Sequence, residues 1–97
     1  MSYSSLLAEN RRLEILRALA QDPGYELNLP LLQDVLRMVG LTASVDQVRV
    51  EAAWLVEQGL AETRDLVGVP LIRLTSRGLD VASGAAVVPG VARPRPE

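Results

Sequence analysis

The segment from Ser44 to Leu60 constrains the fold most strongly, because it encodes both ends of a single helix. Ser44 is a favourable N-cap, since its hydroxyl can accept a hydrogen bond from a free amide of the first turn. Gln47 follows three residues later and can reach back to Ser44, which completes a capping box. At the other end, Gly59 can adopt the left-handed conformation that ends many helices, with Leu60 folded back over the last turn. We therefore predict one helix between these two caps.

Apolar residues within this segment recur at helical spacing, which predicts one buried stripe along the helix. The residues of this stripe are Val45, Val48, Ala52, Leu55 and Val56. The residues predicted to face away from it are Asp46, Gln47, Arg49, Val50, Ala53, Trp54 and Glu57. If Val50, Ala53 and Trp54 are exposed, they form an apolar patch of the kind that marks a contact site.

Two further helices are predicted before this one. The first runs from about Ser5 to Gln21 and ends at the turn sequence Asp22-Pro23-Gly24. Its predicted buried residues are Leu6, Leu13, Leu16 and Ala20, flanked by Ile15 and Leu19. Its predicted solvent-facing residues are Arg11, Arg12, Glu14 and Arg17. The second helix follows the N-cap Asn28 and ends at Gly40. Its apolar residues at helical spacing are Leu32, Val35, Leu36 and Val39.

Beyond Gly59 the spacing of apolar residues changes from helical to alternating, which predicts two short strands. They cover about residues 60–64 and 69–74 and are joined by a turn at residues 65–68. Thr75 is the predicted N-cap of a last helix, from about Ser76 to Ser83. The prolines after it favour an extended tail over residues 85–97, which follows a domain formed by residues 1–84.

The absence of Cys and His from the 97 residues excludes several kinds of site. Disulfides and thiolate metal sites are impossible, and the commonest general base and metal ligand are missing. No nucleophile has a base beside it and no phosphate-binding loop is present, so we predict no enzymatic activity, cofactor or metal. No signal peptide or membrane-spanning segment is recognisable, which predicts a cytoplasmic protein. The formal charge of −2 argues against strong nonspecific DNA binding, although a local positive field can still attract DNA.

The predicted order is three helices, a two-stranded hairpin and a fourth helix, in a mainly α chain of the α+β class. This is the order of the winged helix-turn-helix, in which the third helix usually enters the major groove of DNA. Two motifs resemble ArsR- and MarR-type winged-helix regulators. The run Val48 to Leu60, with Leu55 and then Glu57-Gln58-Gly59-Leu60, resembles the end of their recognition helix. The run Leu74-Thr75-Ser76-Arg77-Gly78 resembles the Leu-Thr-x-x-Gly that follows their wing.

The chain also resembles, over nearly its whole length, a family of small winged-helix proteins encoded by Mu-like prophages. Segments similar to Leu13 to Tyr25, Asp46 to Leu60 and Pro89-Gly90-Val91 recur there in the same order. These resemblances imply a role in DNA binding or transcription. The sequence departs from the regulators because Glu51, Ala53 and Glu57 occupy part of a helix that usually exposes hydroxyl or basic residues.

The first functional hypothesis is a phage or prophage transcriptional regulator that binds duplex DNA as a homodimer. Arg can pair with guanine and Gln with adenine, and the N-terminus of a helix attracts phosphate. The predicted DNA-binding residues are Ser44, Gln47, Arg49, Val50, Ala53, Arg64, Arg73 and Arg77. The alternative interpretation gives Gln47 a capping role only and leaves Arg49 as a solvated surface charge. It pairs the other three arginines with nearby acidic residues as ordinary surface ions.

The second hypothesis is a winged helix that serves as a protein-interaction module in a phage-encoded assembly and binds no DNA. The predicted interface residues are Trp54, Val87, Val88 and Val91. Trp54 either contacts a partner or packs within its own chain. The three valines either pack against a second subunit or belong to a tail that is not ordered. The run from Arg93 to Pro96 also suits a minor groove or an acidic partner. A positive surface around the third helix and hairpin favours DNA, and a mixed or negative surface favours a protein.

Overall fold

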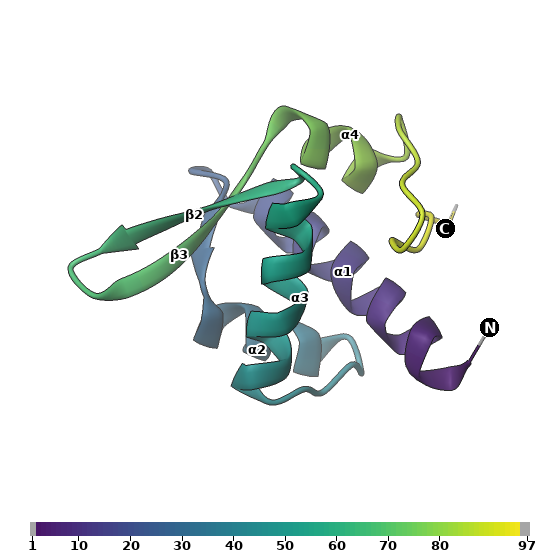
Figure 1. Ribbon diagram of the computed structural model, residues 1–97, viewed down its shortest axis with the longest axis horizontal. Helices are drawn as coiled ribbons and strands as arrows, with labels where there is room; N and C mark the ends of the chain where they lie inside the picture. The colour runs from purple at the N-terminus through teal and green to yellow at the C-terminus, as the bar shows by residue number, and fades with distance from the viewer. Residues whose placement is uncertain (1, 96–97) are drawn as a thin grey trace.

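The computed structural model describes residues 2–95, which form four helices and a three-stranded antiparallel sheet (Figure 1). In chain order the elements are α1 (Tyr3–Gln21), β1 (Glu26–Asn28), α2 (Leu29–Met38), α3 (Val45–Glu57), β2 (Ala61–Leu66), β3 (Val69–Leu74) and α4 (Ser76–Ser83). The helices gather into one body, and the hairpin of β2 and β3 projects from it (Figure 1). This winged-helix-like α+β architecture confirms the predicted fold class.

Both ends of α3 lie where the caps predict them. The Ser44 hydroxyl accepts a hydrogen bond of 3.1 Å from the backbone N–H of Gln47. At the other end, Gly59 has a φ of 75°, and the N–H of Leu60 returns to the carbonyl of Leu55 at 3.0 Å. The second half of the predicted capping box is wrong, because the Gln47 side chain donates its hydrogen bond to Glu51 instead. Local chemistry therefore sets the length of α3.

One strand, β1, is absent from the predicted order. Its three residues pair with β3, which lies in the middle of the sheet order β1-β3-β2. The pairing follows a sharp turn in which Tyr25 has a φ of 58°, and the Tyr25 carbonyl accepts the N–H of Leu74 at 2.8 Å. This short strand ties the start of α2 to the base of the hairpin.

The hairpin turns tightly at its tip. The two central residues, Val67 and Gly68, have φ angles of 51° and 80°, as a two-residue turn with positive φ at both positions requires. The first strand therefore extends to Leu66, two residues further than predicted, while the second begins at Val69 as predicted. Val67 is 95% exposed, so the tip is apolar and points into solvent.

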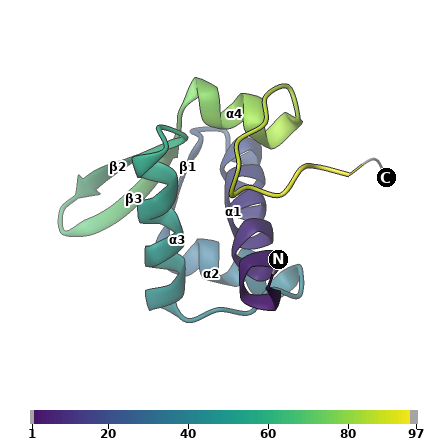
Figure 2. The same cartoon turned by 45° about the vertical axis from the view of Figure 1, so that its right-hand side comes forward.

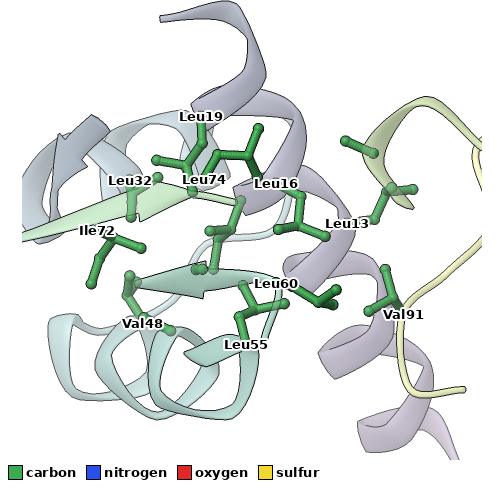
Figure 3. Close-up of a cluster of buried hydrophobic side chains, with 14 of the residues drawn as sticks. Leu13, Leu16, Leu19, Leu32, Val48, Leu55, Leu60, Ile72, Leu74 and Val91 are labelled. Atoms are coloured by element: carbon green, nitrogen blue, oxygen red, sulfur yellow. The ribbon is translucent and has the colours of Figure 1, made fainter. Parts of the chain in front are cut away.

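The core is aliphatic and lies between α1, α2, α3 and the inner face of the sheet (Figure 3). Leu16 and Leu19 of α1 meet Leu32 of α2, while Leu55 of α3 and Ile72 of β3 close the cluster. Each of these elements places its apolar stripe inward, as its spacing predicts. Two predicted core residues near helix ends, Leu6 and Val39, are instead exposed, because neither end is covered by another element.

Three charged residues of α1 and α3 are drawn inward, two of which, Arg11 and Arg12, were predicted to face solvent. Glu51 of α3 is buried, and Arg11 and Arg12 of α1 are half-buried beside it. Helical periodicity assigns charged residues to solvent by default, but α1 and α3 pack together where these three residues occur. These three residues therefore form an ion-pair cluster between two helices of the body.

The C-terminal tail after α4 is folded back onto the body instead of extending from it. Residues 85–95 form no helix or strand, in keeping with their prolines. In Figure 2 the tail, in yellow, leaves α4 and runs beside α1, where the N–H of Ala92 donates to the Glu9 carbonyl at 3.1 Å. Val88 and Val91 are buried in the core cluster. Pro96 and Glu97, which end the predicted Arg-Pro stretch, lie outside the described residues.

Candidate functional site

The outer face of α3 is the exposed side of this helix, formed by Asp46, Arg49, Val50, Ala53 and Glu57. These residues recur every three or four positions, so they share one side of the helix. The buried side chains of Val48, Ala52 and Leu55 lie on another side and hold the helix on the body. The outer face is therefore presented to solvent by a helix that is fixed along its whole length.

Four predicted DNA-binding residues belong to the outer face or to its N-terminal end. Arg49 and Asp46 form an exposed ion pair of 3.2 Å one turn apart. Val50 is 60% exposed and Ala53 is also exposed. Ser44 is exposed at the start of the helix, although its hydroxyl is already used as the N-cap. The structure therefore brings these four residues together on one accessible surface.

Gln47, the fifth predicted residue on α3, is not on the outer face. It is half-buried, and its side-chain amide donates to Oε2 of Glu51 at 3.1 Å. It follows Asp46 of the outer face by one residue, and one residue turns an α-helix by about 100°, so Gln47 lies more than a quarter turn from Asp46. Gln47 is thus a partner of the buried carboxylate rather than a free side chain.

The three arginines beyond α3 occupy different surroundings. Arg64 of β2 pairs across the sheet with Glu26 of β1 at 2.8 Å. Arg73 of β3 is exposed and makes no ion pair within residues 2–95. Arg77, in the first turn of α4, donates to the carbonyl of Gln58 at 2.9 Å and so binds the end of α3. The structure therefore places Arg64 and Arg73 on the hairpin and Arg77 beside the end of α3, all three with exposed side chains.

The surface around α3 and the hairpin carries charges of both signs. Its exposed basic residues are Arg49, Arg64, Arg73 and Arg77. Its exposed acidic residues are Asp46, Glu57, Glu62 and Asp65. The two sets are equal in number, so their formal charges cancel over this surface. The field of this surface is consequently weaker than that of a strongly basic nucleic-acid-binding protein.

A buried polar cluster between α1 and α3 was missed by sequence analysis. Glu51, which is 1% exposed, accepts a hydrogen bond of 3.0 Å from Nε of Arg12 and lies 3.7 Å from Arg11. Buried charges need such partners, because desolvation disfavours an isolated ion. The signal was present in the spacing, since Glu51 lies between Val48 and Leu55 on the edge of the buried stripe.

The predicted interface residues lie mostly inside the chain. Trp54 is half-buried, with the guanidinium carbon of Arg12 4.0 Å from the centre of its ring. Val88 and Val91 are 6% and 5% exposed, because they pack on the chain's own core. Their predicted contact with a second subunit is therefore wrong for this folded chain. Val87 alone of these four residues is exposed.

No metal-binding arrangement is found in the described part of the chain. Within residues 2–95 no three acidic, His or Cys residues are grouped so that they could hold a metal ion. No helix among these residues is both long enough and apolar enough to cross a membrane. A groove of about 250 Å³ lies between α1 and α2, lined in part by Leu27, Val35 and Met38 and by the ion pair of Glu14 and Arg17.

Comparison with known proteins gives two relatives. The sequence is 48% identical over 93 residues to the uncharacterized protein gp26 of Escherichia phage Mu, and the match covers 96% of each chain. It is 36% identical over 80 residues to an uncharacterized protein of Haemophilus influenzae, which covers 81% of this chain and 78% of that protein. No protein-family model and no solved structure matches the sequence. Because the identity to gp26 extends over nearly the whole length of both chains, the protein belongs to the same family as gp26 of phage Mu.

Proposed function

We propose that this protein is a cytoplasmic DNA-binding regulator of a Mu-like phage or prophage, related in fold to ArsR- and MarR-type regulators. The observation that carries the proposal is the outer face of α3, which is exposed beside a projecting hairpin. A helix presented in this way has the dimensions to enter the major groove. In a homodimer, two such helices would read two half-sites of one operator.

The proposed base contacts come from the middle of α3. Arg49 has the donors to bind the O6 and N7 atoms of guanine, while Val50 and Ala53 can contact the methyl group of thymine. The exposed N-terminus at Ser44 favours a nearby phosphate through its free backbone amides. Gln47 is left out of the proposed contacts, because its amide already serves Glu51.

The proposed phosphate contacts come from Arg64 and Arg73 on the hairpin. The Arg49–Asp46 pair is exposed on both sides, and exposed pairs of this kind contribute only about 0.2–1 kcal/mol, so a phosphate can replace Asp46 at little cost. The Glu26 partner of Arg64 is half-buried, so Arg64 would contact a phosphate with its remaining donors. With few free cations, we expect weak nonspecific affinity and a binding strength that depends on base contacts.

The alternative function is a protein-interaction module in a phage-encoded assembly. It is favoured by the mixed charge around α3 and by the apolar tip of the hairpin. At that tip Leu66, Val67 and Val69 are all exposed. Trp54 is no longer the residue on which this alternative rests, since it is covered by Arg12 and the tail. Here the hairpin would be the contact surface.

Fluorescence anisotropy with labelled duplexes from the protein's own genomic neighbourhood tests the proposal at two salt concentrations. We expect micromolar or tighter binding to some duplexes only, weakened by salt. Arg49→Ala should lower the affinity at least about fivefold, which corresponds to about 1 kcal/mol.

Arg37→Ala is a matched control, because Arg37 forms the same kind of exposed pair with Asp34 on α2. It should leave the affinity unchanged. Equal affinities for Arg49→Ala and the wild-type protein would remove α3 as the reading helix. Absence of binding by the wild-type protein at low salt would reject the DNA-binding function and favour the protein-interaction alternative.

A further inference from the structure

The side of α3 that faces α1 carries three residues with a common role. Gln47, Glu51 and Trp54 are spaced by four and three positions, so they form one row along the helix. This row lies about 110° around the helix from the outer face, as the rise and turn of an α-helix require. Any rotation of α3 about its axis that moves this row moves the outer face by the same angle.

Glu51 selects one rotation of α3. Its carboxylate is almost completely removed from solvent, and its partners are Arg12, Arg11 and Gln47. A rotated α3 would leave this carboxylate buried without Arg12, and removing one partner from a buried ion pair is strongly unfavourable. Apolar contacts alone specify rotation less sharply, since Val, Leu and Ala side chains can exchange neighbours.

Arg12 in turn is held by the tail. Its Nη1 donates to the carbonyl of Gly90 at 2.9 Å, while its Nε donates to Glu51 and its guanidinium stacks over Trp54. The guanidinium is planar and its donors point in fixed directions, so these three contacts fix its orientation. Removal of the tail therefore removes one of the three contacts that orient Arg12, the partner of Glu51.

The tail fits this position only with glycine at residue 90. Gly90 has a φ of 100°, and a Cβ atom there would lie 2.5 Å from the ring of Trp54. On both sides of it, Val88 and Val91 are buried in the core, and the N–H of Ala92 donates to the Glu9 carbonyl of α1. The backbone of the tail thus reaches Trp54 and Arg12 directly.

We propose that residues 85–92 are a latch that acts through Arg12 and Glu51 to fix the rotation of α3. Arg12 and Glu51 are positioning residues: they orient α3 and are not themselves proposed to contact a ligand or partner. The latch determines which residues form the outer face. Its effect on ligand binding rests on the proposed function, whereas the latch itself does not. An undocked tail would remove one of the contacts that orient Arg12 and so weaken the constraint that Glu51 adds to the rotation of α3.

A double-mutant cycle tests the latch without any ligand. Gly90→Ala displaces the tail from Trp54, and Glu51→Gln removes the charge that depends on Arg12. Urea unfolding, followed by Trp54 fluorescence, gives the folding equilibrium constant of each protein. We expect Gly90→Ala to lower this constant in both backgrounds. The factor should be at least about five times larger in the wild-type background than in the Glu51→Gln background, because residues in one network are coupled.

Gly40→Ala is the matched control for the cycle. Gly40 also has positive φ, at 79°, but an added Cβ meets no atom within 4 Å, so only backbone strain changes. Its effect should be the same in both backgrounds. Equal effects of Gly90→Ala in the two backgrounds would overturn the latch. If Gly90→Ala does not fold, Val91→Ala weakens tail docking by removing a buried side chain next to Gly90, and the same coupling is expected.

Amide hydrogen exchange separates positioning from general stability. In Val91→Ala we expect protection to fall more in α3 than in α2, because the latch supports α3 specifically. A uniform fall in both helices would overturn the proposal. If the wild-type protein binds DNA, Val91→Ala should also weaken that binding under conditions where the variant is fully folded. Failure of the wild-type protein to bind DNA would reject the proposed function and leave the result of the cycle intact.

Discussion

Substitution of Gly78 by alanine gives a sharp test of how α4 packs, because local propensity and tertiary packing predict opposite signs. Gly78 lies in the first turn of α4 and is buried. A Cβ atom at this position would lie 2.0 Å from the carbonyl oxygen of Leu60 and 2.7 Å from Cδ1 of Leu74. The Leu60 carbonyl cannot easily withdraw, since it accepts the N–H of Thr75 at 3.2 Å.

The magnitude follows from two opposing contributions. In a helix, alanine is favoured over glycine by about 1 kcal/mol. Overpacking a close contact costs about 1–3 kcal/mol, and the upper value applies here because the contacted atom belongs to the backbone. We therefore expect Gly78→Ala to lower the free energy of unfolding by about 2 kcal/mol. For a domain of this size, that loss corresponds to a melting temperature about 10 °C lower.

Urea unfolding followed by circular dichroism measures this effect. Ser83→Ala is the control, because Ser83 is exposed near the end of the same helix and alanine there meets no close contact. The control should change stability by less than about 0.5 kcal/mol, as is usual for surface substitutions. If Gly78→Ala is as stable as the wild-type protein or more stable, then α4 does not approach the Leu60 carbonyl as described.

Two further predictions concern the hairpin tip and the start of α4. Val67→Asn should stabilise the protein by about 1 kcal/mol in thermal unfolding, because Val67 has a φ of 51°, where asparagine is tolerated and a β-branched residue is strained. An unchanged or lower melting temperature would show that this turn carries no such strain. Thr75→Ala should cost about 1–2 kcal/mol, since its hydroxyl caps the Gly78 N–H at 3.0 Å and donates to the Gly59 carbonyl at 2.8 Å. Thr75→Ser should retain most of that stability, and equal losses in the two variants would assign the effect to the Thr75 methyl group.

The charge of the α3 surface bears directly on the choice between the two functions. Every basic side chain near α3 except Arg73 has a carboxylate or carbonyl partner in the folded chain. A DNA-binding role therefore requires that phosphates displace these partners, whereas a protein partner could pair with both signs of charge as they stand. The salt dependence of any binding would distinguish these cases, since release of counterions from DNA gives a steep slope.

Sequence alone was sufficient for the caps and for the periodic core. Ser44 and Thr75 cap helices because each accepts from an amide three residues away, which no distant residue needs to arrange. Leu16 and Leu55 are buried because each lies on the apolar stripe of its own helix. These features depend on interactions within one or two turns, so the order of residues specifies them directly.

Other features were decided by the tertiary structure. The three-residue strand β1 has no pattern long enough to predict a strand, and it exists because β3 supplies its hydrogen bonds. The prolines of the tail predict a non-helical segment, but its course along the body follows from tertiary contacts, since Val88 and Val91 are buried in the core and Gly90 lies against Trp54 and Arg12.

The polar residues of α1 and α3 show most clearly which features are local and which depend on tertiary packing. Helical periodicity correctly separates apolar from polar residues, but it assigns every charge to solvent. Arg12 and Glu51 are 39 positions apart, and only the packing of α1 against α3 brings them to 3.0 Å. The sequence determined which residues could form each helix and its core stripe, because those preferences are local. The tertiary structure decided which charges are buried, and through them how α3 is rotated, because the ion pair depends on where two separate helices meet.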